Sequence, residues 1–295
     1  MIIVIAGPTG VGKTKLSIEL AKKLNGEIIN ADSTQIFKDL NIATAKVTKE
    51  EMENIPHHLL DMKEITEDYT VYDYQQDARK KIKEIESKGH IPILVGGTGL
   101  YIKAALYDYK FHSESNAKTD YSRFTKEELY QQLLKVDPNT EIHMNNRKRV
   151  ERALDYFKEN NQPISSKKHT DKLLYDTIWI GLTTDRELLY DRINHRVEEM
   201  MKQGLLEEAK KIYDSSIRTK AIMTPIGYKE LFSYFDGKVT LEDAIHLIQQ
   251  RSRNYAKRQY TWFRHQLDMK WFDVDFKNFN NTVVEVLNYI EDVKK

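Results

Sequence analysis

"GPTGVGKT", residues 7–14, decides the first part of the fold. It meets the phosphate-loop pattern G-x-x-x-x-G-K-[ST] in full, with Lys13 and Thr14 at its end. The apolar run Ile2–Ala6 before it is typical of a buried strand, and leucines at helical spacing follow until Gly26, which is expected to end the helix. Strand, loop and helix in this order predict a site for a diphosphate or triphosphate, because backbone N–H groups and a helix N-terminus converge on phosphate oxygens.

Each part of this loop has a chemical task in the predicted site. Glycines let successive N–H groups approach the phosphate, Lys13 can bridge the outer phosphates, and Thr14 can reach a magnesium ion. The alternative is a Gly-rich turn that only leads into a helix, but the agreement of motif and context favours the phosphate site. Mg²⁺ is therefore the expected cofactor, with Thr14 as its protein ligand.

The composition narrows the classes of protein that this chain can be. It has 295 residues, enough for a core with an inserted second unit, and its lack of Cys excludes a disulfide scaffold, thiol catalysis and Cys-ligated metal. We find no secretory signal and no apolar run of membrane-spanning length. A cytoplasmic protein without a membrane partner is expected.

Positive charge is concentrated in one segment, although the formal net charge is only +1. Residues 244–267, "AIHLIQQRSRNYAKRQYTWFRHQL", contain five Lys or Arg residues and no acid. The acidic content of the whole chain predicts about three or four acids in a segment of this length. We therefore expect a face here that meets a negatively charged partner.

Strand and helix signals alternate along most of the chain. Further strands are expected at residues 27–31, 91–95 and 177–181, and helices at 71–88, 185–203, 205–213 and 240–264. This alternation predicts an α/β fold with a P-loop NTPase-like parallel sheet flanked by helices. The strand signal vanishes further along, where helices are expected at 126–135 and 147–160. We predict a catalytic core at 1–110 and 173–295, with an inserted all-helical subdomain at 111–172.

The residues that follow each strand are the candidate site, since ligands bind beyond the C-terminal ends of parallel strands. The second strand leads into Asp32, whereas the apolar run 91–95 is followed by glycines and Thr98. Asp32 could order magnesium, or it could act as a general base that takes a proton from an attacking nucleophile. A structural alternative is that Asp32 caps a helix, with Gln35 as its capping-box partner.

Seven motifs along most of the chain resemble those of one enzyme family. They are "GPTGVGKT", "INADSTQIFKDLNIATAK", "PHHLLD", "ILVGGTGLYIKAAL", "KRVERAL", "IGYKEL" and "RNYAKRQYTWFR". Together they resemble the tRNA dimethylallyltransferases, prenyl transferases that modify the adenosine just after the anticodon. The resemblance implies that a dimethylallyl group passes from dimethylallyl diphosphate to the exocyclic amine (N6) of that adenosine, with release of diphosphate.

The resemblance also assigns the diphosphate site and the reacting residues. It implies that the loop binds dimethylallyl diphosphate rather than ATP, and that Asp32, Thr98 and Lys13 are catalytic, with Asp32 as the base. Arg192 and Arg196, four residues apart on one helix face, are candidates for a further clamp, but such arginines are also commonly solvated. The predicted diphosphate-binding residues are Gly7, Pro8, Thr9, Gly10, Val11, Gly12, Lys13, Thr14, Arg192 and Arg196.

The second substrate implied is an RNA base, which must leave the stack of the anticodon loop before its amine can react. By the resemblance, the turn at Asp32 reads the base, while the insertion and the basic segment grip the anticodon stem-loop. Trp262 shares a helix face with Arg251 and could stack on RNA or pack in the core. The predicted tRNA-binding residues are Asp32, Ser33, Thr34, Gln35, Arg149, Arg152, Arg251, Lys257 and Arg258.

A few features depart from the family pattern. Ala43 and Val47 stand where the family usually has Gly and Pro, and Lys148 stands where it has Gln. Residues 109–139 form a shorter segment than the family's. His57 and His58 are expected in a structural turn, since adjacent histidines do not easily share one metal ion.

Two other functions compete with prenyl transfer. A nucleotide or small-molecule kinase would share the phosphate loop and magnesium, but it commonly ends a second strand in a carboxylate and has no need of an acid-free basic helix. An RNA-binding regulator switched by a nucleotide would not need Asp32 as a base. For the prenyl transferase, a monomer is expected.

Overall fold

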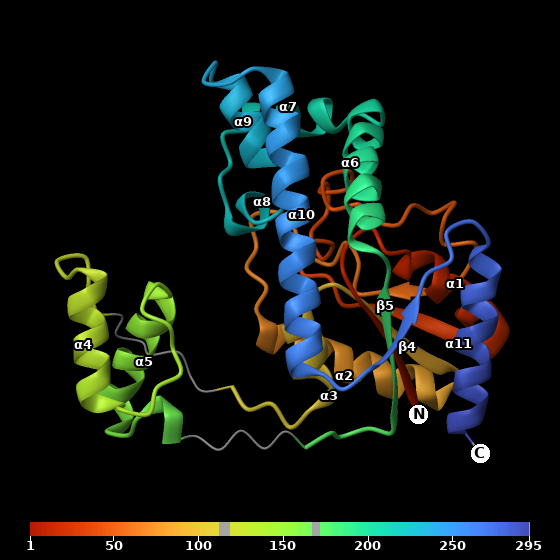
Figure 1. Ribbon diagram of the computed structural model, residues 1–295, viewed down its shortest axis with the longest axis horizontal. Coiled ribbons are helices and arrows are strands. Elements are labelled where there is room, and N and C mark those ends of the chain that lie inside the picture. Colours follow the sequence, from red (N-terminus) through yellow and green to blue (C-terminus); the bar gives the residue numbers. More distant parts are fainter. Residues whose placement is uncertain (112–118, 167–171, 295) are drawn as a thin grey trace. The chain divides into compact units, whose positions relative to one another are not determined.

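A computed structural model describes residues 1–111, 119–166 and 172–294. Its described part contains a six-stranded sheet in the order β3-β2-β4-β1-β5-β6, in which all neighbouring strands are parallel (Figure 1). The predicted parallel sheet flanked by helices is confirmed. The strands are β1 (Ile2–Ala6), β2 (Gly26–Asn30), β3 (His57–His58), β4 (Ile91–Gly96), β5 (Thr177–Thr183) and β6 (Lys270–Asp273).

Central strand β1 explains why the sheet is covered on both faces. All five of its residues are buried, as expected for a continuous apolar run in a parallel sheet. Ile2 and Val4 belong to one core cluster, shared with helices α2 (Val71–Ser87) and α3 (Gly99–Leu106). Ile3 and Ile5 belong to a second cluster, shared with helices α1 (Lys13–Leu24) and α11 (Phe279–Val293). Successive side chains of a strand point to opposite faces, so one strand supplies both cores.

Nine helices belong to the described part of this core. Thr70 and Thr240 begin α2 and α10 with capping boxes, in which a threonine hydroxyl and an aspartate three residues later satisfy the first free N–H groups. None of the described helices combines the length and apolar character that a membrane crossing requires. The helices are α1 (Lys13–Leu24), α2 (Val71–Ser87), α3 (Gly99–Leu106), α6 (Arg186–Lys202), α7 (Leu205–Asp214), α8 (Lys220–Met223), α9 (Tyr228–Phe235), α10 (Leu241–Gln266) and α11 (Phe279–Val293).

The expected end of the first helix at Gly26 is wrong by one residue. Asn25 takes the left-handed conformation that ends α1, with φ 52°, and its N–H bonds back to Ala21. Gly26 instead begins β2, where a Cβ atom would lie 2.6 Å from Cδ1 of Ile93 on the neighbouring strand. The glycine is needed for close packing between strands, not for the helix end.

The chain divides into two compact units, Met1–Tyr107 with Leu173–Lys295, and Asp108–Lys172. The second unit contains the expected insertion and has its own small core around Leu129, Leu133 and Val150. Its described elements are α4 (Lys126–Val136), α5 (Arg147–Asn160) and the 3-10 turn η1 (Ile164–Ser166). Residues 112–118, part of the segment 109–139 that was expected to be shorter than the family's, lie outside the described residues.

Candidate active site

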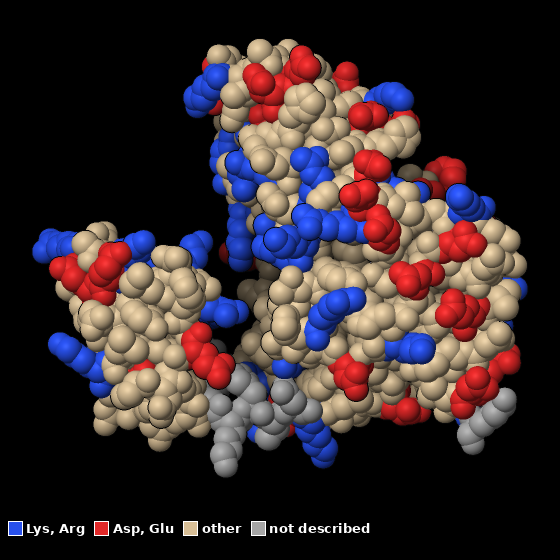
Figure 2. All heavy atoms as spheres, in the orientation of Figure 1, with Lys and Arg blue, Asp and Glu red and all other residues tan. Residues whose placement is uncertain are grey.

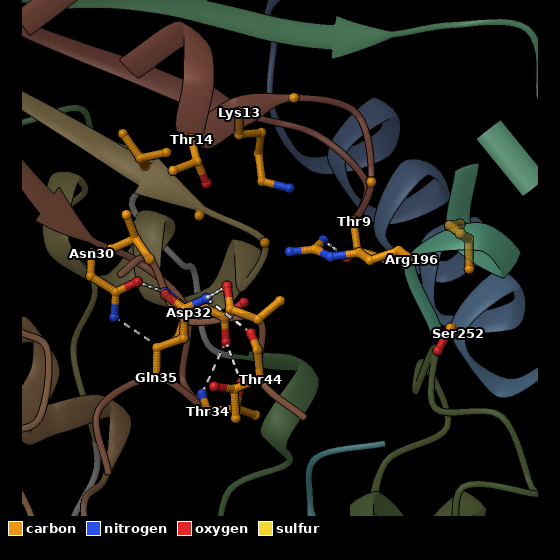
Figure 3. Close-up of a pocket in the computed structure, with 18 of the residues that line it drawn as sticks. Thr9, Lys13, Thr14, Asn30, Asp32, Thr34, Gln35, Thr44, Arg196 and Ser252 are labelled. Atoms are coloured by element: carbon orange, nitrogen blue, oxygen red, sulfur yellow. Dashed lines mark hydrogen bonds between the residues drawn. The ribbon is translucent and has the colours of Figure 1, made fainter. Parts of the chain in front are cut away.

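A pocket of about 1100 Å³ lies where the carboxyl ends of β1, β2 and β4 meet (Figure 3). Its lining comes from the phosphate loop, the turn after β2, helix α6 and helix α10. Ligands of parallel α/β sheets bind at this edge, because the loops that follow neighbouring strands converge there. Two of the predicted catalytic residues, Lys13 and Asp32, line this pocket.

The phosphate loop is shaped by glycines with positive φ angles. Gly10 and Gly12 have φ values of 84° and 97°, and Gly12 precedes the first residue of α1. The Lys13 ammonium group folds over the loop and donates to the carbonyl oxygens of Gly7 and Pro8, at 3.0 and 2.8 Å. Burial lowers the pKa of Lys13 to about 8; Asp32 acts against this shift and Arg196 adds to it. Lys13 therefore loses its proton at a lower pH than a solvated lysine does, and a bound anion would stabilise its charged form.

Helix α6 brings two arginines to the same loop. A guanidinium nitrogen of Arg196 lies 3.3 Å from the hydroxyl of Thr9, and Nε of Arg192 donates to the carbonyl of Gly10 at 3.2 Å. The Arg192 guanidinium also stacks on the ring of Phe276, 3.7 Å from its centre. Desolvation lowers the pKa of both arginines. The structure thus places both predicted clamp residues beside the loop.

Asp32 lies in a turn and not at the start of a helix, so the helix-cap alternative is wrong. Its backbone N–H donates to the side chain of Asn30 at 3.0 Å. Its Oδ1 atom accepts from the backbone N–H and the hydroxyl of Thr34, at 3.0 and 2.7 Å. These bonds fix the carboxylate, which faces the cavity opposite Lys13 and Arg196 (Figure 3).

Thr98, the third predicted catalytic residue, supports the Asp32 turn. Its Oγ1 atom accepts from the Ser33 backbone N–H at 3.0 Å and lies 3.3 Å from the Ser33 hydroxyl. The two segments meet closely, because a Cβ atom at Gly96 would lie 2.2 Å from the carbonyl group of Ala31. Thr98 is not among the residues that line the pocket. Its contacts favour a role in holding Ser33 and Asp32.

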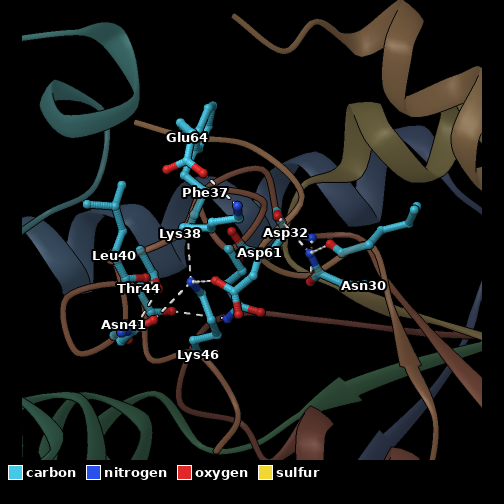
Figure 4. A network of polar contacts seen from close by, with 12 residues as sticks. Asn30, Asp32, Phe37, Lys38, Leu40, Asn41, Thr44, Lys46, Asp61 and Glu64 are labelled. Atoms are coloured by element: carbon cyan, nitrogen blue, oxygen red, sulfur yellow. Dashed lines mark hydrogen bonds and ion pairs between the residues drawn. The ribbon is translucent and has the colours of Figure 1, made fainter. Parts of the chain in front are cut away.

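The loop at residues 41–46 forms the next wall of the pocket, and sequence reasoning missed what holds it. The Gln35 side-chain amide donates to the carbonyls of Thr44 and Ala45, at 3.1 and 3.3 Å. Lys46, whose side chain is only 5% exposed, pairs with Asp61 at 2.5 Å and donates to the carbonyl of Phe37 (Figure 4).

From the other side, the carboxylate of Glu208 on α7 accepts from three backbone N–H groups of this loop, those of Asn41, Ile42 and Ala43. It also accepts from the Tyr228 hydroxyl at 2.8 Å. The bonds between Glu208 and the loop join residues more than 160 positions apart, so no local sequence pattern predicts them.

Lys and Arg side chains gather over the part of the core that α10 occupies (Figures 1 and 2). The predicted residues Lys257 and Arg258 line a shallow groove with Asn254, Thr261 and Trp262, and Arg258 also lines the main pocket. The indole ring of Trp262 packs on α3, where a Cβ atom at Gly99 would lie 2.0 Å from it. Trp262 therefore combines core packing with one edge in the groove.

Two basic residues of the same helix make other contacts. Arg251 forms an ion pair with Glu230, a carboxylate with no exposed side-chain surface whose other oxygen caps α9 at Gly227. Arg253 donates to the side chain of Asn194 on α6. The structure thus gives Arg251 a partner within the protein, while its side chain remains 46% exposed.

Of Arg149, Arg152, His57 and His58, only His57 is among the residues that line the pocket. Arg149 and Arg152 are exposed residues of α5, in the insertion unit. His57 and His58 form the edge strand β3 and not a turn. Buried Glu27 contacts His58, His90 and Lys88; burial alone would raise its pKa, but these partners outweigh it and hold the pKa near 2.

A strand, a phosphate loop and a helix on a parallel sheet, with a carboxylate across the pocket from the loop lysine, define a P-loop protein with a catalytic site. The family model described as IPP transferase matches residues 35–266. The chain belongs to this family.

Relatives of known name agree over nearly the whole chain. A tRNA dimethylallyltransferase of Anoxybacillus flavithermus is 49% identical over 298 residues, which cover 98% of this chain and 96% of the relative. One of Bacillus anthracis is 48% identical, with 98% and 95% covered.

Solved structures of the family share the fold. The tRNA isopentenylpyrophosphate transferase of Bacillus halodurans matches with a TM-score of 0.77 at 43% identity, covering 99% of this chain and 95% of that one. A eukaryotic dimethylallyltransferase acting on tRNA matches with a TM-score of 0.85 at 32% identity, covering 99% and 78%. The predicted family, the P-loop NTPase-like fold and the transferase class are confirmed.

Proposed function

We propose that this protein transfers the dimethylallyl group of dimethylallyl diphosphate to N6 of the adenosine that follows the anticodon in tRNA. The observation that carries the proposal is the single pocket into which both Lys13 and the Asp32 carboxylate open. A leaving diphosphate and an attacking amine need such groups on opposite sides of one carbon atom. The names of the relatives favour this transfer over the kinase and regulator alternatives.

In this reaction the protein binds the diphosphate and takes a proton from the attacking amine. The phosphate loop, Arg192 and Arg196 bind the diphosphate and neutralise the charge that grows as its C–O bond breaks. The lone pair of N6 forms the new C–N bond, the electrons of the C–O bond leave with diphosphate, and the amine proton passes to Asp32. Thr34 and Asn30 keep the Asp32 turn in place throughout.

The donor set near the loop fits magnesium. Among the residues that the structure describes, no group of three or more His, Cys, Asp or Glu side chains could hold a metal ion. Mg²⁺ does not need one, because it commonly combines one or two protein oxygens with substrate phosphates and water. Thr14, at the start of α1 and on the pocket wall, would hold the ion, whose charge would stabilise the leaving diphosphate.

The tRNA contacts are proposed from exposure and position. Ser33 and Thr34, in the turn beside the pocket, would bind the flipped adenine, and Gln35 would contribute through its free carbonyl oxygen, since its amide nitrogen already holds the 41–46 loop. Lys257 and Arg258 would meet the RNA backbone at the groove. Arg149 and Arg152 of the insertion, the monomeric state and the cytoplasmic location stay predictions.

The experiment is transfer of label from dimethylallyl diphosphate to unmodified tRNA, with ATP turnover followed in parallel. We expect magnesium-dependent labelling only when adenosine follows the anticodon. Asp32→Asn should lower the rate at least about a hundredfold, and leave the binding of inorganic diphosphate intact. Asp39→Asn, an exposed aspartate of the same segment, is the matched control. A near-normal rate for Asp32→Asn would defeat the assignment of the base, and ATP consumption without labelling would defeat the transfer itself.

A further inference from the structure

Gln259 is a polar side chain of α10 that is only 5% exposed and whose two polar atoms both have backbone partners in the active site. Its Oε1 atom accepts from the N–H of Thr9 in the phosphate loop at 2.9 Å. Its Nε2 atom donates to the carbonyl of Gly97, just before Thr98, at 3.0 Å. One amide therefore joins the loop after β1 to the turn after β4, and both to α10.

The turn at Gly97 is shaped to receive this amide. A Cβ atom at residue 97 would lie 2.1 Å from Nε2 of Gln259, and its next nearest neighbours are 3.4 Å away or more. The φ angle of Gly97 is not in the left-handed region, so any residue could adopt this backbone. Glycine is required here for the space that Gln259 fills.

The neighbours of Gln259 on α10 face both substrates of the proposed reaction. Tyr255, one turn earlier, contacts the side chains of Thr98 and Gln259 and lines the pocket. Arg258, the preceding residue, lines both the pocket and the basic groove with Lys257. Because α10 is a continuous helix of 26 residues, a ligand that holds its basic side also holds the position of Gln259.

Resting on the function proposed above, we propose that Gln259 is a positioning residue that couples RNA bound on α10 to the geometry of the diphosphate loop. By holding the Thr9 peptide it sets the path of the loop, and by holding Gly97 it sets the turn that carries Thr98. RNA that fixes the position of α10 then also fixes the phosphate loop, through the side chain of Gln259. Because coupling between two ligands is reciprocal, RNA should raise the affinity for diphosphate, and diphosphate should raise the affinity for RNA by the same factor.

The test measures binding of inorganic diphosphate with magnesium, which needs no transfer reaction, in the presence and absence of an anticodon stem-loop RNA. We expect the RNA to raise diphosphate affinity about tenfold in the unaltered protein. Gln259→Leu removes both hydrogen bonds and should reduce this factor to about one. Gln250→Leu, an exposed glutamine of the same helix, should leave it unchanged.

A second pair of variants separates positioning from a general loss of structure. Where Gln259 is kept, Gly97→Ala should weaken diphosphate binding, because the new methyl group displaces the Gln259 amide. In a Gln259→Ala background the space is empty, so the same change should have little further effect. Equal effects of Gly97→Ala in both backgrounds would overturn the contact.

The outcomes also distinguish this inference from the proposed function. RNA that binds the unaltered protein without changing diphosphate affinity would overturn the coupling alone. RNA that does not bind at all would overturn the proposed function, and the coupling with it.

Discussion

Replacing Glu208 with Ala tests whether α7 holds the loop that borders Asp32. The carboxylate of Glu208 accepts from the backbone N–H groups of Asn41, Ile42 and Ala43, and from the hydroxyl of Tyr228, at distances between 2.8 and 3.1 Å. Hydrogen bonds to a charged acceptor contribute about 1.5–3 kcal/mol when water cannot replace them. The three loop donors are exposed or partly exposed, whereas Tyr228 is buried, so an average of about 0.5–1 kcal/mol for each of the four bonds is reasonable. Glu208→Ala should therefore lower the free energy of unfolding by about 2–4 kcal/mol.

Urea unfolding followed by far-UV circular dichroism measures this difference directly. Glu208→Gln keeps one acceptor oxygen and should lose about half as much. Glu207→Ala removes the adjacent exposed carboxylate and should change the free energy of unfolding by no more than about 0.5 kcal/mol. If Glu208→Ala and Glu207→Ala unfold at the same urea concentration, Glu208 does not anchor the loop.

The remaining predictions concern charge. Burial lowers the pKa of Lys13 to about 8, and a bound diphosphate must raise it, so binding takes up a proton above pH 8. Calorimetry should show diphosphate affinity falling by up to about tenfold per pH unit above pH 8; an affinity unchanged from pH 8 to 9.5 would contradict this. Arg251→Ala leaves the buried carboxylate of Glu230 unpaired and should destabilise the protein by about 3 kcal/mol in urea unfolding. Lys257→Ala should leave stability unchanged and reduce the salt dependence of RNA binding by about one phosphate contact; the reverse pattern for these two variants would refute their assignments.

Much of the core could be predicted from the sequence, because its strands are buried runs and its helices have amphipathic spacing. Strand β1 matched its predicted bounds, and α10 differed from its predicted bounds by one residue at its start and two at its end. Strands β3 and β6 were missed, since they are two and four residues long and only partly buried. Their pairing depends on the neighbouring strand and not on a pattern of their own.

The residues of the candidate site could likewise be predicted only where they have a local sequence signal. The phosphate loop and Asp32 carry local signals, a motif and a carboxylate after a strand, and the structure brings both to one pocket. Glu208 and Gln259 carry none, because their backbone partners lie 162 to 250 positions away in the chain. Charge counting found the basic helix but could not tell that Arg251 faces Glu230, since the orientation of one side chain depends on packing.

The way the insertion leaves the core has a consequence for how such a chain can be built. Tyr107 and Leu173 pair as neighbours in an antiparallel bridge, and the N–H of Asp108 donates to the carbonyl of Lys172 at 2.9 Å. The two ends of the 65-residue segment between them are therefore neighbours in space, which is typical of sites where an insertion is tolerated. Such a segment can be lengthened, shortened or exchanged by recombination without stretching the sheet. The family could therefore vary the length of this segment over evolutionary time while the sheet and the phosphate loop stayed the same.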